Sequence, residues 1–182
     1  MFEVRNQDDL LAAFKDLGNS RADAQATRNL LRKAEGASVF ILQSFFKEIL
    51  TEARRSVDKK VDPMEIILAL AKIAGYSRDA DDFAMAIALL PKIHNRCAKA
   101  RAKKAVAVAY ARAGKFREAR DFAKNIKNHF WRAEARVAIA EMTKCPKDLT
   151  EAEKDLVHIN TNDVREEVEA QIRALKRTMG VK

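Results

Sequence analysis

Short sequence signatures recur in this chain at a spacing of 33 residues, and this spacing constrains the fold more than any other feature. The triplet Ile93–Asn95 is followed by Ile126–Asn128 and then by Ile159–Thr161, each 33 residues after the one before. Gly114 and Gly180 are separated by twice that interval. A unit of 33 residues has room for two helices. The spacing therefore predicts an α-solenoid, in which each helical hairpin packs against its neighbours.

The residues between these signatures have helical periodicity. Apolar residues recur at spacings of three and four, without the alternation of a strand. Capping boxes precede apolar runs at Ser20–Asp23, Asp62–Glu65 and Thr150–Glu153. All five glycines, Gly75 and Gly114 among them, follow such runs and are predicted to be left-handed C-caps. We predict an all-α chain of about ten helices, over residues 8–17, 20–34, 38–57, 63–74, 78–89, 95–113, 115–127, 129–143, 150–158 and 162–179.

The whole chain, residues 1–182, is predicted to be a single domain with about three degenerate hairpin repeats over residues 63–180. Gly75 and Gly114 are separated by more than one repeat interval, so the first repeat is predicted to carry an insertion around Ala86–Pro91. Residues 1–60 show no repeat and are predicted to form helices that cap the array. Their core stripe is predicted to be Phe40, Phe45, Phe46, Ile49 and Leu50.

The positive charge of the chain is concentrated in one block. Lys and Arg number 35 and Asp and Glu 26, for a net charge of +9, whereas residues 92–136 alone hold 14 Lys and Arg against 3 Asp and Glu. Residues 1–91 and 137–182 each have a net charge of −1. Such a local field favours an acidic partner, although a basic face that only contacts solvent would give the same pattern.

The sequence lacks the residue patterns of a catalytic, metal or cofactor site. It contains no glycine-rich phosphate loop, no HExxH and no CxxC. His94, His129 and His158 stand singly and are predicted to be surface or capping residues. Cys97, near a helix start, is predicted to be buried. We therefore expect a non-enzymatic protein that needs no metal and no cofactor.

No apolar run approaches the roughly 20 residues of a membrane-spanning helix, and the first residues do not resemble a secretory signal. Two cysteines are too few for a disulfide scaffold and suit a reducing compartment. We expect a cytoplasmic protein that does not associate with membranes. Pairing of two copies through their end hairpins remains open.

The segment Ala105–Ile126 resembles a tetratricopeptide repeat, and more distantly a pentatricopeptide repeat. Ala107 and Ala119 stand where that family has small residues at the helix contact. Tyr110 stands where a Tyr fills the gap between hairpins, and Gly114 where the inter-helix turn needs Gly. The resemblance implies a right-handed superhelix of antiparallel hairpins.

The match is incomplete, because Lys103 and Trp131 stand where the family prefers Trp and Pro. In tetratricopeptide-like arrays the first helix of each hairpin lines a concave groove, which binds a segment of a partner protein. The resemblance implies that helices 95–113, 129–143 and 162–179 line it here.

The groove positions implied by the resemblance form one basic stripe. Such a stripe would hold the carboxylates of an acidic or C-terminal segment of another protein. The predicted partner-binding residues are Arg101, Lys104, Val108, Ala111 and Arg112, with Lys144 extending the stripe into the next unit.

The alternative partner is nucleic acid. Seven cations outside that stripe could follow a phosphate backbone, and Phe130 and Trp131 offer aromatic rings for stacking. The cations are Lys99, Lys103, Lys115, Arg117, Arg120, Lys124 and Lys127.

Overall fold

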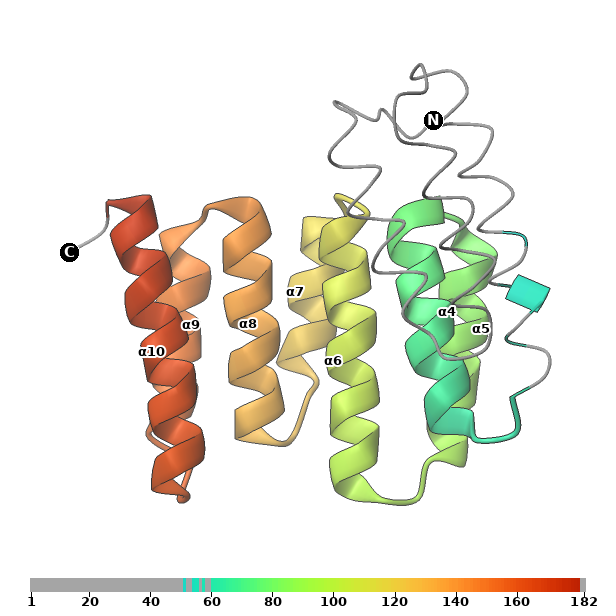
Figure 1. Ribbon diagram of the computed structural model, residues 1–182, viewed down its shortest axis with the longest axis horizontal. Coiled ribbons are helices and arrows are strands. Elements are labelled where there is room, and N and C mark those ends of the chain that lie inside the picture. Colours follow the sequence, from blue (N-terminus) through green and yellow to red (C-terminus); the bar gives the residue numbers. More distant parts are fainter. Residues whose placement is uncertain (1–50, 52–53, 56, 58–59, 181–182) are drawn as a thin grey trace, which may run out of the picture.

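The computed structural model describes residues 51, 54, 55, 57 and 60–180. This part is all-helical and contains seven α-helices and no strand, which confirms the predicted all-α class. The predicted helices 8–17 and 20–34, most of 38–57 and the predicted N-terminal core stripe lie outside the described residues. The helices are α4 (Pro63–Ser77), α5 (Ala80–Leu89), the 3-10 turn η1 (Leu90–Lys92), α6 (Arg96–Arg112), α7 (Phe116–Lys124), α8 (His129–Thr143), α9 (Pro146–Leu156) and α10 (Asn162–Met179) (Figure 1).

The helices form two layers (Figure 1). The first layer contains α4, α6, α8 and α10, and each of these helices packs against the next one in the layer. The second layer contains α5, α7 and α9, each paired with the first-layer helix that precedes it. In the described part of the chain, no Cα atoms of different second-layer helices lie within 8 Å of one another, although side chains of α7 and α9 meet. The first layer is therefore the more closely spaced of the two.

First-layer helices begin at intervals of 33 residues because their N-caps recur at that spacing. The N-caps are Asp62, Asn95, Asn128 and Thr161. The Oδ1 of Asn95 accepts a hydrogen bond of 2.9 Å from the backbone N–H of Ala98, and the Asp62 and Asn128 side chains cap their helices in the same way. Such caps satisfy backbone donors that the first helical turn leaves unpaired.

The recurring triplets are thus the starts of first-layer helices. Ile93, Ile126 and Ile159 lie two residues before a cap and are all buried. Equal spacing of the caps shows that the predicted insertion around Ala86–Pro91 is wrong. The irregular spacing lies in the second layer instead, whose helices begin at residues 80, 116 and 146.

Gly75 lies inside α4, so its prediction as a helix cap is wrong. The helix continues past it, and Arg78 takes the left-handed conformation (φ 60°). Gly75 instead permits close packing, because a Cβ at this position would lie 3.3 Å from the Cα of Ala109. The predicted left-handed caps Gly114 (φ 79°) and Gly180 (φ 66°) are confirmed.

Helix α9 begins at Pro146, four residues before the predicted start. The capping box Thr150–Glu153 is therefore wrong: Thr150 lies within the helix, and its hydroxyl donates to the carbonyl of Pro146 (3.4 Å). Proline favours the first helical turn, where its missing N–H leaves no hydrogen bond unmade.

The core consists of three clusters in a row, each between consecutive helices. One lies among α4, α5 and α6, one among α6, α7 and α8, and one among α8, α9 and α10. The middle cluster is rich in alanine and includes Ala107 and Ala119, so α6 and α7 approach closely. Tyr110 stacks on Phe83, with ring centroids 4.1 Å apart, and contacts Phe122. It therefore links adjacent hairpins, as predicted.

A buried carboxylate, Asp148 of α9, ties this helix to α7 and α8. It accepts two hydrogen bonds from the guanidinium of Arg120 (2.8 and 2.7 Å) and one from the hydroxyl of Thr143 (3.1 Å). The hydrogen bond to Asp148 raises the pKa of Arg120 above its usual value. We call this arrangement the clasp.

The same clasp occurs two hairpins earlier in the chain. Asp82 of α5 is buried, and it accepts from Arg54 (3.1 and 2.6 Å) and from the hydroxyl of Ser77 (2.8 Å). In α7 the corresponding third residue is Glu118, which is exposed. The clasp therefore recurs with every second hairpin, although the helix caps recur with each one.

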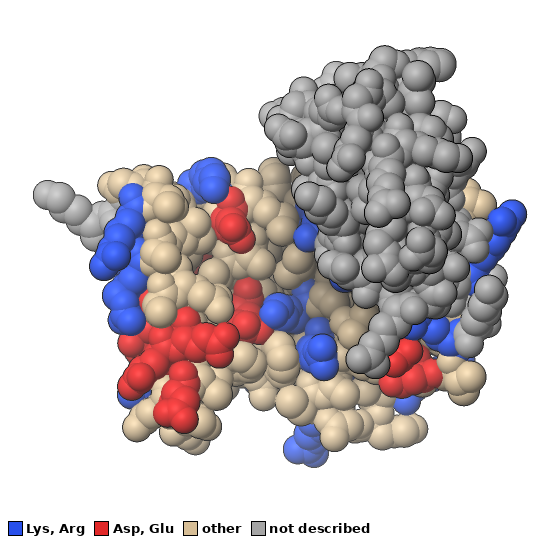
Figure 2. All heavy atoms as spheres, viewed as in Figure 1, with Lys and Arg blue, Asp and Glu red and all other residues tan. Residues whose placement is uncertain are grey.

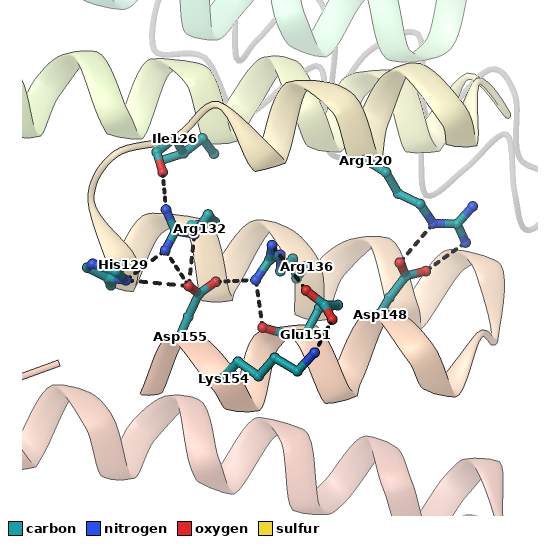
Figure 3. A network of polar contacts seen from close by, with 9 residues as sticks. All are labelled: Arg120, Ile126, His129, Arg132, Arg136, Asp148, Glu151, Lys154 and Asp155. Carbon is teal, nitrogen blue, oxygen red and sulfur yellow. Dashed lines mark hydrogen bonds and ion pairs between the residues drawn. The ribbon is translucent and has the colours of Figure 1, made fainter. Parts of the chain in front are cut away.

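Helices α8 and α9 are joined by Asp155, which is 3% exposed (Figure 3). It accepts hydrogen bonds from Arg132 Nε (2.8 Å) and Arg136 Nη1 (2.7 Å). Nearby, a hydrogen bond from Lys154, aided by the charge of Arg136, lowers the pKa of Glu151. Arg132 and Arg136 thus act inside the fold, which leaves fewer cations of the basic block for a partner.

Candidate functional site: a groove between α4 and α6

A groove of about 500 Å³ lies between the first-layer helices α4 and α6, and α8 contributes to its edge. Within the described residues its charged lining is five cations and one acid. Its apolar lining comes mainly from small side chains on the facing helices. The lining residues are Lys60, Glu65, Leu68, Ala69, Ala71 and Lys72 from α4 and its approach, Arg101, Lys104, Ala105, Val108, Ala109 and Arg112 from α6, and Trp131 from α8.

Four of the predicted partner-binding residues lie together in this groove: Arg101, Lys104, Val108 and Arg112. They share one face of α6 because their spacings of three, four and four residues match the helical repeat. Lys144 lies apart from them, as the left-handed C-cap of α8, and does not line the groove.

The prediction that Ala111 lines the groove is wrong. Ala111 is buried in the middle core cluster together with Ala119 and Ala123 of α7. One residue further along α6, the backbone has turned by about 100°, so Arg112 faces the groove while Ala111 faces the second layer.

Small side chains make room for the groove. Ala69 on α4 faces the same space as Ala105 on α6, and Leu68 and Val108 add larger apolar surface. Packing at Gly75 brings the two helices together beside this space. The result is an apolar floor between two helices that carry long basic side chains.

Two of the groove cations have acidic partners within the chain. Lys104 Nζ lies 2.6 Å from Glu134 Oε2 and sits over the ring of Trp131, 5.2 Å from its centroid. Lys60 Nζ lies 3.1 Å from Glu65 Oε2. Each pair removes positive charge from the field that a ligand would meet.

Arg101 is the most available of the groove cations. Its side chain is exposed, and it has no ion-pair partner among the described residues. On the face drawn in Figure 2, Lys and Arg gather between α6 and α8, whereas Asp and Glu gather over the lower half of α10.

The α4 wall of the groove was missed by sequence reasoning. Three of its residues lie one repeat interval of 33 residues before groove residues of α6. They are Leu68, Ala71 and Lys72, which correspond to Arg101, Lys104 and Ala105. The interval between the helix caps therefore predicts that this part of α4 faces the groove stripe of α6. The mistaken equivalence of Gly75 with Gly114 concealed this relation.

The seven cations predicted for nucleic acid do not lie together. Lys99 and Lys103 lie in the first half of α6, and Lys124 and Lys127 lie at the end of α7 and in the turn after it. The other three lie in the first half of α7 or just before it: Lys115 has its ammonium over the ring of Phe83, Arg117 is exposed, and Arg120 belongs to the clasp.

The predicted stacking residues also serve packing. Phe130 packs against the C-terminal core cluster. Trp131 is half-buried, and its Nε1–H donates to Cys97 Sγ (3.3 Å). Cys97 is exposed, so its predicted burial is wrong.

No group of three His, Cys, Asp or Glu side chains that could hold a metal ion occurs among the residues the structure describes. Of the helices in that part, none is both long and apolar enough to cross a bilayer. No protein-family model, curated protein or solved structure matches the chain. The groove is therefore interpreted from its own geometry and chemistry.

Proposed function

We propose that this protein is a non-enzymatic interaction module that binds an acidic or C-terminal segment of a partner protein in the groove between α4 and α6. The observation that carries the proposal is the position of Arg101, exposed and without an ionic partner among the described residues, beside an apolar floor. Lys104 and Arg112 follow it along the same helical face.

The layer arrangement supports a tetratricopeptide-like right-handed superhelix as the architecture. First-layer helices in the described part pack closely, whereas the backbones of the second-layer helices stand further apart. An array with this difference in spacing curves toward its closely spaced layer. The groove would then lie on the concave side, where such repeats bind their ligands.

The side chains suit a ligand with carboxylates next to an apolar residue. The guanidinium of Arg101 can hold a carboxylate through two parallel hydrogen bonds, and the Lys104 ammonium supplies a point charge. Glu134 lies 2.6 Å from Lys104 and competes with an incoming carboxylate. Leu68 and Val108 supply apolar contact between the charged positions.

Fluorescence anisotropy with labelled peptides tests this function. The probes are a peptide of Asp, Glu and Leu residues with a free C-terminus, the same peptide amidated, and a Lys-substituted version. We expect the acidic peptides to bind and Arg101→Glu to weaken binding by at least about tenfold, or about 1.4 kcal/mol. Arg117→Glu makes the same change of charge on exposed α7 and is expected to have little effect.

A second variant separates the groove from bulk charge. Val108→Trp fills the apolar floor without changing the charge, so it should weaken the acidic peptides even at low salt. Equal losses in Arg101→Glu and Arg117→Glu, with none in Val108→Trp, would mean that the groove is not the binding site.

A further inference from the structure

A second basic surface lies at the edge of the array, where α5 joins α6 and α7 joins α8 (Figure 1). Residues 92–100 and 122–133, which form this edge, contain no Asp or Glu. We call it the basic edge and define it by five cations: Lys92, Arg96, Lys99, Lys124 and Lys127.

Two side-chain contacts bring the segments of the basic edge together. Lys103 Nζ donates to the backbone carbonyl of Asn125 (3.1 Å), which links the middle of α6 to the C-cap of α7. Trp131 Nε1 donates to Cys97 Sγ (3.3 Å), which fixes the first turn of α8 beside the first turn of α6. Cations from two segments that are distant in the chain therefore lie on one surface.

The cations of the basic edge are not engaged inside the fold. None of the five has an ion-pair partner among the described residues, and all but the half-buried Lys99 are exposed. Arg120, Arg132 and Arg136, from the same basic block, are bound instead to the buried Asp148 and Asp155. The basic edge thus holds charge that the fold itself does not use.

We propose that the basic edge binds the phosphate backbone of single-stranded nucleic acid, at a site separate from the groove. Four of its five cations are lysines, which act as point charges and suit repeated phosphates better than the planar geometry of one carboxylate. The two links hold the segments that carry these charges side by side. A flexible single strand can adjust its backbone to cations that come from two separate segments.

The polar side chains of the basic edge indicate binding without base recognition. The Oδ1 atoms of Asn95 and Asn128 cap α6 and α8, and the Asn125 amide donates to the Asp121 carbonyl (2.9 Å).

A membrane surface fits this edge poorly. The exposed large apolar residues of the described part are Val61, Met85, Phe116 and Val157, and none of them lies in the two edge segments.

The test uses the full chain and fluorescein-labelled oligomers of mixed sequence: single-stranded RNA, single-stranded DNA and duplex DNA. Binding is measured by anisotropy over a series of salt concentrations. We expect both single strands to bind at low salt and affinity to fall as salt rises. The double variant Lys124→Glu/Lys127→Glu should lower affinity at least about tenfold and reduce the slope of log affinity against log salt by about 1.4, since each phosphate contact contributes about 0.7.

The matched control is Lys147→Glu/Arg177→Glu, which changes the net charge equally at exposed positions on α9 and α10. It should retain most of the affinity, and circular dichroism should show both double variants as helical as the parent. Equal losses in the two double variants would overturn the proposal, as would the absence of single-strand binding at low salt or tighter binding of the duplex. Arg101→Glu should leave oligomer binding intact, so a failure of the groove proposal can be told apart from a failure of this one.

Discussion

At the scale of single residues, two glycines serve different purposes. Gly114 has a φ of 79°, and a Cβ at this position would meet no atom within 4 Å. Gly75 has an ordinary helical backbone but packs against the Cα of Ala109. A larger residue would therefore strain the backbone at Gly114 and would press against α6 at Gly75.

We expect Gly114→Val to lower the free energy of unfolding by about 1 kcal/mol or more, because a β-branched residue is strained at positive φ. Gly114→Asn is the control, since Asn tolerates the left-handed conformation better. Denaturant titration by circular dichroism measures both. Equal stability of Gly114→Val and the parent would contradict the strain argument.

Tyr110 predicts a dependence of stability on alkaline pH. Burial, followed by the charge of Glu118, raises the pKa of the Tyr110 phenol. The folded state therefore holds this proton to higher pH than the unfolded state, whose tyrosines titrate near pH 10. The contribution to stability is complete below about pH 10 and declines as the pH rises above it. Ultraviolet titration of Tyr76→Phe isolates Tyr110, and a midpoint at or below about 10 would contradict this expectation.

At the scale of elements, the clasp predicts unequal costs for two ion pairs. Arg120→Met leaves the buried carboxylate of Asp148 with only the Thr143 hydroxyl among its side-chain partners, so we expect a loss of about 2 kcal/mol or more. Lys154→Ala breaks an exposed pair with Glu151 and should cost less than about 0.5 kcal/mol. Adding Asp148→Leu to Arg120→Met should recover stability, and a double-mutant cycle in urea measures this coupling.

The starts of the first-layer helices could be predicted from the sequence because their caps are local. Asn95 and Asn128 accept hydrogen bonds from N–H groups three residues further on, so the recurring triplets indicate where these helices begin. Gly75 could not be assigned in this way, since close packing and a left-handed cap both select glycine. Only the α6 side of the groove could be predicted, because its stripe follows from helical spacing. The ion pair of Lys104 with Glu134 joins two different helices, so the sequence did not indicate it.

At the scale of the whole molecule, three core clusters in a row predict local responses to mutation. Ile172 belongs to the C-terminal cluster and Ile67 to the cluster around α4, and both are buried. Nearest-neighbour packing confines the effect of a cavity to the hairpins that line it.

We expect Ile172→Ala to cost about 2 kcal/mol or more and to speed amide exchange in α8, α9 and α10, with α4 and α5 little changed. Ile67→Ala should give the reverse pattern. Hydrogen exchange read by mass spectrometry distinguishes the two variants. Uniform acceleration along the whole chain in either variant would indicate a single cooperative unit.

The equal spacing of the helix caps has a mechanical consequence. Because first-layer helices begin every 33 residues, a chain pulled by its ends would release length in similar portions, each about 110 Å of extended backbone. The portions would not yield at equal force, because α7 and α9 are joined by the Arg120–Asp148 ion pair, whereas α5 and α6 are joined by the stacked rings of Phe83 and Tyr110. Under tension the molecule would lengthen in steps of similar length that need different forces. Added salt would weaken the ionic junction and leave the aromatic one unchanged.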